Sequence, residues 1–221
     1  MTEQLNVQQM AERLCAADNI LVLCHKNPDG DTIGCGSALC HALKALGKTA
    51  AVLCSDAVPS RYSFTAPVPF RGEFEPKTVV AVDVASVQLF GENNGVPQYT
   101  RHVDLCIDHH PTNSHYAKKE LVCPDKAACG EIVLAVIKEM CGGITQEEAD
   151  LLYIAVTTDT GCFQYLNTNA ATFRAAAELL EYGADTGMVD VKFFRKASRA
   201  RLKLEGMIYS TMGFYRDGKI S

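Results

Sequence analysis

The sequence lacks the features that would place it among membrane or secreted proteins. No stretch of its 221 residues approaches the roughly 18 consecutive apolar residues that a membrane-spanning helix needs. The first ten residues also lack the basic and then apolar segments of a secretory signal peptide. We therefore expect a cytoplasmic protein that makes no membrane contact.

An excess of basic residues is absent as well. The formal net charge is −5 and the isoelectric point is near 5.7. Proteins that bind long nucleic-acid duplexes ordinarily present a strongly basic face. The sequence thus argues against a long-duplex binder and is compatible with a short nucleotide held mainly through its phosphate.

The ten cysteines include no Cys-x-x-Cys pair, which argues against a zinc site or a disulfide framework. Cys24, Cys54 and Cys106 lie inside apolar runs, where a free thiol packs as a small hydrophobe. Cys35 and Cys162 lie beside candidate site residues, and packing is again favoured there over an oxidation-sensitive role.

What the sequence does contain is an alternation of strand and helix patterns. At 48% hydrophobic residues the chain can bury a full core. Apolar runs predict strands over 20–24, 49–54, 78–83 and 103–107, and helical periodicity predicts helices around 7–14, 39–46, 126–141, 145–157 and 169–182. Thr145 and Glu148 are spaced as a helix-capping box. This order predicts an α/β fold with a doubly wound parallel sheet flanked by helices.

Two segments are less regular. Residues 55–76 contain four prolines and predict a surface loop or lid. Residues 197–215 predict one long helix, and residues 215–221 predict a turn that opens a new strand. We therefore expect a catalytic domain over 1–195 and, over 196–221, a linker helix with the start of a truncated second domain that is itself absent.

Polar clusters follow four of the apolar segments. They are His25 with Asp29 and Asp31 after 20–24, Asp83 at the end of 78–83, Asp108 to His110 after 103–107, and Asp159 after the helix at 145–157. The carboxyl ends of parallel strands meet at one crevice, so side chains far apart in sequence converge there. Each cluster alone is a weak signal, because a polar turn after a strand is ordinary. Their combination predicts a functional site.

The residue types suit a pair of divalent metal ions. Carboxylates can bridge two ions, and neutral imidazoles supply directional nitrogen ligands. The candidate metal ligands are His25, Asp29, Asp31, Asp83, His109 and Asp159. Their total charge is about −4 at pH 7, which nearly balances the charge of about +4 on two divalent ions. Such a site can activate a water molecule to attack a phosphoester, so no side-chain nucleophile is required.

The spacing of the first cluster suggests how one segment serves both ions. Pro28 and Gly30 alternate with the aspartates and favour a turn over a helix at this point. An extended turn would aim Asp29 and Asp31 at two neighbouring ions. A helix that begins shortly afterwards would add backbone donors and partial positive charge for phosphate oxygens.

Four motifs, in this order, resemble those of the DHH phosphoesterase family: His25 to Gly34 (HKNPDGDTIG), Val82 to Ser86 (VDVAS), Ile107 to Asn113 (IDHHPTN) and Thr158 to Phe163 (TDTGCF). They are most similar to the branch of bacterial nano-RNases that also act on 3′-phosphoadenosine 5′-phosphate. The resemblance implies a manganese-dependent hydrolase. It would degrade very short single-stranded RNA to nucleoside 5′-monophosphates and would also remove the 3′-phosphate of 3′-phosphoadenosine 5′-phosphate. The resemblance is compatible with a homodimer.

The resemblance also assigns roles. His25, Asp29 and Asp83 would hold one Mn²⁺. The other Mn²⁺ would be held by Asp31, Asp83, His109 and Asp159, so that Asp83 bridges the two ions. Mg²⁺ and Co²⁺ are alternatives. His110 would face the scissile phosphate and Asp108 would orient a histidine, so the catalytic set is His110, Asp83 and Asp108. Residues 1–195 would be the DHH domain.

Three other functions remain open. Cyclic di-AMP cleavage is the nearest enzymatic alternative. The pyrophosphatase branch of the family needs a closing domain rich in lysine and arginine, which the sequence lacks. A nucleotide-binding regulatory module would keep the fold without turnover, but a complete ligand set argues against it. Asn113 and His115, just after the Asp-His-His motif, are candidates for substrate contact or ordinary loop residues.

Overall fold

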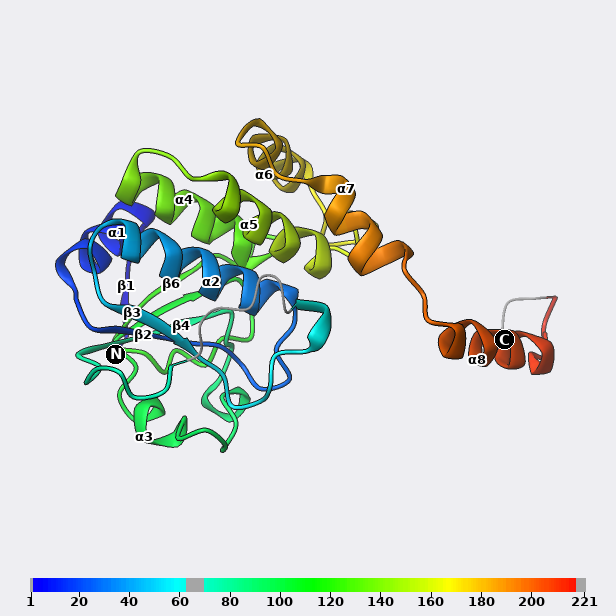
Figure 1. Cartoon of the computed structure of the whole chain (residues 1–221), viewed down its shortest axis with the longest axis horizontal. Helices are drawn as coiled ribbons and strands as arrows, with labels where there is room; N and C mark the ends of the chain where they lie inside the picture. The colour runs from blue at the N-terminus through cyan, green and yellow to red at the C-terminus, as the bar shows by residue number, and fades with distance from the viewer. Residues whose placement is uncertain (1, 63–69, 218–221) are drawn as a thin grey trace.

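The centre of the molecule is one sheet of six parallel strands. The computed structural model describes residues 2–62 and 70–217. The strands run in the order β1-β6-β5-β4-β2-β3 (Figure 1). Their bounds are β1 Glu3–Gln4, β2 Ile20–Leu23, β3 Ala50–Leu53, β4 Thr78–Val82, β5 Leu105–Asp108 and β6 Lys119–Val122. The predicted parallel α/β fold is confirmed, and β1 and β6 are additional strands that the sequence patterns did not reveal.

The helices agree with the predicted alternation. Their bounds are α1 Val7–Ala16, α2 Gly30–Ala45, α3 Pro97–Thr100, α4 Cys129–Cys141, α5 Gln146–Asp159, α6 Ala170–Glu181, α7 Thr186–Val189 and α8 Arg199–Thr211. Two short 3₁₀ turns, η1 Ser60–Tyr62 and η2 Val87–Leu89, and a π-helical turn, η3 Asp190–Arg195, complete the described elements. The capping box of Thr145 and Glu148 opens α5 as predicted. No helix among the described residues is both long and apolar enough to cross a membrane.

The two faces of the sheet are covered differently. Helices α1, α2, α4 and α5 lie on one face, and α3 lies on the other (Figure 1). The helical face holds the larger apolar core, in which Ile20, Leu39 and Val133 are fully buried. The opposite core is smaller and is closed by loops and short turns, with Phe90 and Val96 packed against the strands.

The chain reverses its winding direction between β2 and β4, which are hydrogen-bonded neighbours. After β2 the chain enters α2 and continues to β3 on one side, whereas β4 leads by way of η2 and α3 to β5 on the other side. The two connections therefore separate at the carboxyl ends of these strands. In open α/β sheets this reversal point is where a ligand-binding crevice forms.

Helix α2 is wedged between the sheet and α5, and its glycines make the close approach possible. A Cβ atom added at Gly34 would lie 2.4 Å from the carbonyl oxygen of Leu151 and 3.0 Å from the Cβ of Ala155, both on α5. Helix backbones can approach this closely only where one side chain is missing. The position of α5, which ends at Asp159, thus depends on Gly34.

Four sequence predictions need correction or fall partly outside the described residues. The segment around Gly30 is the first turn of α2 rather than an extended turn, because Asp29 caps the helix by accepting from the amides of Asp31 and Thr32. The last helix is shorter than 197–215 and covers Arg199–Thr211. The predicted loop over 55–76 includes 63–69 and the predicted strand start includes 218–221, which lie outside the described residues.

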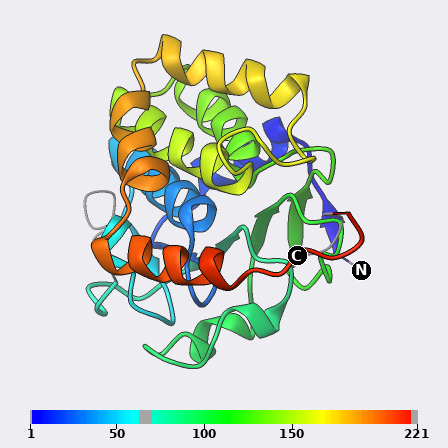
Figure 2. The same cartoon turned by 90° about the vertical axis from the view of Figure 1, so that its right-hand side faces the viewer.

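Helix α8 lies apart from the helices that cover the sheet, at the end of the molecule that faces the viewer in Figure 2. None of its residues is buried. It follows a short extended segment after η3, which ends at Arg195. The division of the chain into domains at 195 stays a prediction.

Candidate metal centre

The six predicted ligands come from five places in the fold that meet at one edge of the sheet. His25 follows β2, Asp83 follows β4 and His109 follows β5, while Asp29 and Asp31 begin α2 and Asp159 ends α5. The helix capped by Asp29 starts at the carboxyl end of β2, so its first turn points into the crevice at the reversal point. Residues 134 positions apart in sequence therefore become neighbours, from His25 to Asp159.

His25, Asp29 and Asp83 form the first group. The Nε2 atom of His25 lies 3.5 Å from Oδ1 of Asp29 and 3.7 Å from Oδ2 of Asp83. One ligand atom from each of the three lies within 4.8 Å of the others, a spacing that a single metal ion can span. The Asp29 side chain is half exposed, so this group opens to solvent.

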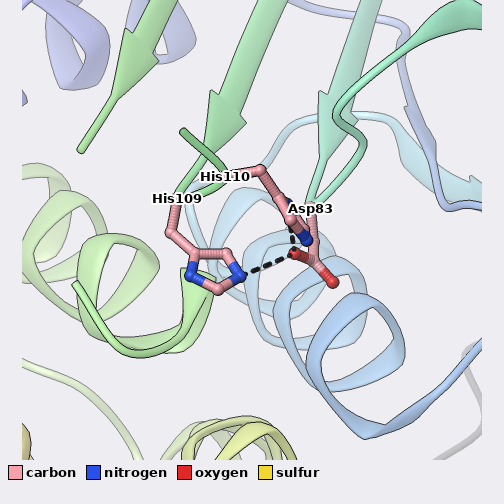
Figure 3. Close-up of side chains that lie close together, drawn as sticks. All are labelled: Asp83, His109 and His110. Atoms are coloured by element: carbon pink, nitrogen blue, oxygen red, sulfur yellow. Dashed lines mark ion pairs between the residues drawn. The ribbon is translucent and has the colours of Figure 1, made fainter. Parts of the chain in front are cut away.

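Asp31, His109 and Asp159 form the second group, which also meets the 4.8 Å limit. Its centre is Nε2 of His109, which lies 3.8 Å from Oδ2 of Asp31 and 3.6 Å from Oδ2 of Asp159. The same nitrogen lies 3.5 Å from Oδ1 of Asp83, and Figure 3 marks this ion pair with a dashed line. The two carboxylate oxygens of Asp83 thus face different groups, which is the arrangement a bridging ligand requires.

Backbone carbonyls fix the orientation of both histidines. The Nδ1–H of His25 donates to the carbonyl of Lys26 over 2.7 Å, and that of His109 donates to the carbonyl of Lys126 over 3.2 Å. A carbonyl can only accept, so in the neutral ring Nδ1 carries the proton and Nε2 keeps its lone pair. Metal-binding histidines are commonly held in this way.

Two buried atoms at the centre have no hydrogen-bond partner among the described residues. They are Oδ1 of Asp83 and Nε2 of His109. A buried polar atom without a partner is costly, and native proteins almost always satisfy such atoms. Both atoms can accept a cation, and both belong to the predicted ligand set. The residues present therefore fit a divalent metal centre.

Comparison with known proteins places the chain in a family. The sequence profile described as DHH family, N-terminal domain, matches residues 19–156, well over half of the chain. The chain belongs to the DHH family. The match includes the motifs that carry His25, Asp29, Asp31, Asp83 and His109 and ends just before Asp159.

Named relatives of this DHH protein include two curated bacterial proteins. A bifunctional oligoribonuclease and PAP phosphatase NrnA of Thermus thermophilus is 35% identical over 217 residues, which is 95% of this chain and 64% of that protein. A protein of the same name from Mycoplasma genitalium is 28% identical over 87% of this chain and 62% of its own length. The chain thus spans less than two thirds of either relative.

A solved structure supports the fold of the DHH protein. The crystal structure of an exopolyphosphatase-related protein from Bacteroides fragilis matches with a TM-score of 0.82 over 95% of this chain and 66% of that one. Its sequence identity is 24%. The likeness at this identity establishes the α/β architecture described above.

Crowded carboxylates dominate the electrostatics of the DHH centre. Burial, followed by the neighbouring charges of Asp83 and Asp159, holds the pKa of Asp31 well above its usual value. Burial and the charge of Asp29 do the same to the pKa of Asp83, and burial raises the pKa of Asp159. Ionised carboxylates at these positions are therefore unfavourable in the protein alone, and a multivalent cation would stabilise them.

In His25 the surroundings favour the charged form instead. Burial would lower the pKa of its imidazole, but the hydrogen bond and the charge of Asp29 outweigh this effect and raise the pKa to about 9. The same contact lowers the pKa of Asp29 against the effect of its burial. Without a metal ion, His25 and Asp29 thus form an ion pair. A metal ion would replace the proton between them.

The start of α4 supports Asp31. The backbone amides of Cys129 and Gly130 donate to its two carboxylate oxygens over 2.7 and 3.0 Å. These are the first two residues of α4, whose positive end favours the carboxylate. The two amides that donate to Asp31 and the Lys126 carbonyl that accepts from His109 are backbone groups, so they leave no signal in the residue types and were not predicted from the sequence.

His110 and Asp108 lie beside the two groups, and His110 also forms a third candidate ligand group with Asp83 and His109. The Nδ1–H of His110 donates to Oδ1 of Asp108 over 2.7 Å. The same nitrogen lies 3.6 Å from Oδ1 of Asp83, an ion pair that Figure 3 marks with a dashed line. Asp108 is fully buried, and it belongs to none of the candidate ligand groups of the described residues. His110 is partly exposed, with 38% of its side chain accessible. Its Nε2 is the nitrogen left for a substrate.

The remaining candidates have local roles. Asn113 is buried and bonds to Asp108, which favours an ordinary loop residue over substrate contact, the two alternatives left open by the sequence. The ring of His115 contacts the buried side chain of Glu120. All ten cysteines are free thiols, and Cys35 is buried as expected for packing.

Proposed function

We propose that this DHH protein is a two-metal phosphoesterase that hydrolyses very short single-stranded oligoribonucleotides to nucleoside 5′-monophosphates and removes the 3′-phosphate of 3′-phosphoadenosine 5′-phosphate. The observation that carries the proposal is the pair of ligand groups on either side of Asp83, with two of their buried atoms unsatisfied. The names of the curated relatives support the substrate class. Manganese, a cytoplasmic location and a homodimer stay predictions.

The centre divides the proposed reaction between its residues. His25, Asp29 and Asp83 would hold one divalent ion, and Asp31, Asp83, His109 and Asp159 the other. Two such ions would polarise the phosphoryl oxygens and lower the pKa of an attacking water. Asp83 sets the separation of the two groups, because one of its oxygens faces each. Its backbone is left-handed, with φ of 58°, a sparsely populated conformation that occurs often at functional sites.

His110 is the proposed contact to the scissile phosphate. Asp108 occupies its Nδ1, which fixes the ring and leaves Nε2 of this partly exposed side chain for a substrate. In the protonated ring, Nε2–H can donate to a non-bridging phosphate oxygen or to the leaving oxygen. A bound phosphate would thus have a donor from His110 in addition to the two ligand groups.

The proposal is tested by the products the chain releases. We would incubate the full chain with Mn²⁺ and, separately, 5′-phosphorylated diadenylate, 3′-phosphoadenosine 5′-phosphate, cyclic di-AMP and pyrophosphate, and separate the products by chromatography. We expect 5′-AMP from the first two substrates. Cleavage of cyclic di-AMP or pyrophosphate alone would assign a different branch of the family. A chain that binds metal but consumes none of the four would contradict the proposal.

The adjacent histidines provide a matched pair of variants. His109→Gln removes a ligand and is expected to lower the bound Mn²⁺ by one ion per chain. His110→Gln leaves both ligand groups intact and is expected to keep the full metal content while kcat falls about 10²- to 10⁴-fold, the range for loss of a general acid or base. Metal analysis and steady-state kinetics of both variants would check this. Equal metal loss in the two variants would show that His110 is a ligand instead.

A further inference from the structure

Short hydrogen bonds link the loop before β6 to the Asp108–His110 pair. The backbone amide of His115 donates to Oδ1 of Asn113 over 2.7 Å. The Nδ2 atom of Asn113 donates to Oδ2 of Asp108 over 2.6 Å. Oδ1 of Asp108 in turn accepts from Nδ1–H of His110. Each oxygen of the buried Asp108 carboxylate therefore has its own donor.

We infer that Asn113 is a positioning residue, which holds the Asp108 carboxylate in the plane that aims His110 at the substrate. The inference rests on the proposed function, since it gives His110 a substrate to face. Asn113 is 7% exposed and Asp108 is fully buried, so water does not offer Asp108 an equivalent donor. Without Asn113, the carboxylate is free to rotate about its Cβ–Cγ bond, and His110 can follow it.

The amide of Asn113 can satisfy its neighbours in only one orientation. Rotating it by 180° would place its oxygen against the Asp108 oxygen and its NH₂ group against the His115 amide. Two acceptors would then face each other at one end and two donors at the other. The orientation with Nδ2 toward Asp108 is therefore set by the surrounding groups.

The loop itself is anchored on both sides of Asn113. The backbone amide of Asn113 donates to the carbonyl of His110 over 3.1 Å, which closes a tight turn. His115 adopts a left-handed backbone with φ of 54°, its carbonyl accepts from the Thr2 hydroxyl over 2.7 Å, and its ring contacts Glu120. These contacts hold the backbone amide of His115 in position to donate to Oδ1 of Asn113. Thr2, just before β1, and Gln4, in β1, thus support the loop before β6 through His115 and Glu120.

A double-mutant cycle tests whether Asn113 acts through Asp108. We would compare wild-type protein, Asn113→Ala, Asp108→Ala and the double variant in metal content, KM and kcat on 3′-phosphoadenosine 5′-phosphate. Loss of such a supporting partner typically costs about 10- to 100-fold in activity. We expect that loss in kcat for Asn113→Ala, with KM and bound Mn²⁺ unchanged. In the Asp108→Ala background the same change should alter kcat less than about 2-fold, because the partner is already gone.

Two controls keep the test decisive. Asn113→Asp keeps the shape of the side chain but replaces the donor with an acceptor, so it should lose kcat at least as strongly as Asn113→Ala. Wild-type kcat in Asn113→Asp, or multiplicative losses in the double variant, would overturn the inference.

An NMR measurement is independent of activity and of the stability of the Asn113 variants. In wild-type protein the Nδ2 hydrogens of Asn113 should exchange slowly with solvent, and Asp108→Ala should shift their resonances and speed their exchange. Unchanged resonances in Asp108→Ala would overturn the inference. If the wild type cleaves no phosphoester, the proposed function fails, whereas this NMR result still decides whether Asn113 holds Asp108.

Discussion

Asp83→Asn is expected to lower phosphoester hydrolysis by on the order of 10³-fold and to reduce the bound metal from two ions to at most one. Asp83 is the residue whose two oxygens face the two ligand groups, one toward His25 and one toward His109. An amide nitrogen cannot replace the second oxygen, because it donates and repels a cation. The variant therefore removes the ligand shared by the two groups without changing the size of the side chain.

The same variant should not destabilise the metal-free protein. Burial and neighbouring charges raise the pKa of Asp83, so its ionised form is less favourable in the folded protein than in the unfolded chain. A raised pKa of an acid means that stability is lost as the pH rises above the unfolded value. At pH 8 the neutral asparagine avoids this loss. Asparagine also tolerates the left-handed backbone at this position.

The loss of activity and bound metal and the effect on stability can be measured on one preparation of Asp83→Asn. Metal analysis and kinetics give the first, and thermal unfolding with and without Mn²⁺ gives the second. Addition of Mn²⁺ should raise the Tm of the wild type much more than that of Asp83→Asn. Asp104→Asn is a matched control, because Asp104 lies before β5 at the opposite end of the sheet and pairs with Lys118. A fully active Asp83→Asn with both ions bound would rule out the bridging role.

Gly34→Ala is expected to cost about 3 kcal/mol of folding free energy, the upper range for overpacking a tight interface. The new methyl group would lie 2.4 Å from the backbone carbonyl oxygen of Leu151. A backbone atom cannot move aside as a flexible side chain can, so α2 and α5 must separate. Asp159 at the end of α5 would move with that helix, and metal affinity should fall as well.

For a chain of this length the loss corresponds to a decrease in Tm of about 6–12 °C. Gly206→Ala is the matched control, because Gly206 lies in α8 and a Cβ there meets no atom within 4 Å. That change should leave metal binding unaltered and should not lower Tm, because alanine favours a helix more than glycine does. A Gly34→Ala protein as stable as the wild type would show that α2 and α5 do not pack as described.

The parts of the fold that could be predicted from sequence are those whose side chains alone identify them. Strands β2, β4 and β5 are buried on both faces, so they are continuous apolar runs that end at polar residues. The positions of His25, Asp83 and His109 at one sheet edge follow from that pattern. Strands β1 and β6 escaped prediction because β1 is two exposed residues long and β6 begins with Lys119 and Glu120.

The parts that could not be predicted depend on backbone groups and on distant partners. Asp29 is a helix cap as well as a candidate ligand, and the Pro and Gly beside it suggested a turn where α2 in fact begins. The carbonyl of Lys126 and the amides that support Asp31 belong to residues whose side chains take no part. The role of Asn113 requires knowing that its amide reaches Asp108, which is set by the loop conformation.

The central claim is that two metal ions bind on either side of Asp83. The most direct test is an anomalous difference map from a crystal of this chain soaked in Mn²⁺. The structure predicts two peaks, one among His25, Asp29 and Asp83 and one among Asp31, His109 and Asp159, with Asp83 contacting both. No peak at either group, or a single peak without contact to Asp83, would contradict the two-metal centre.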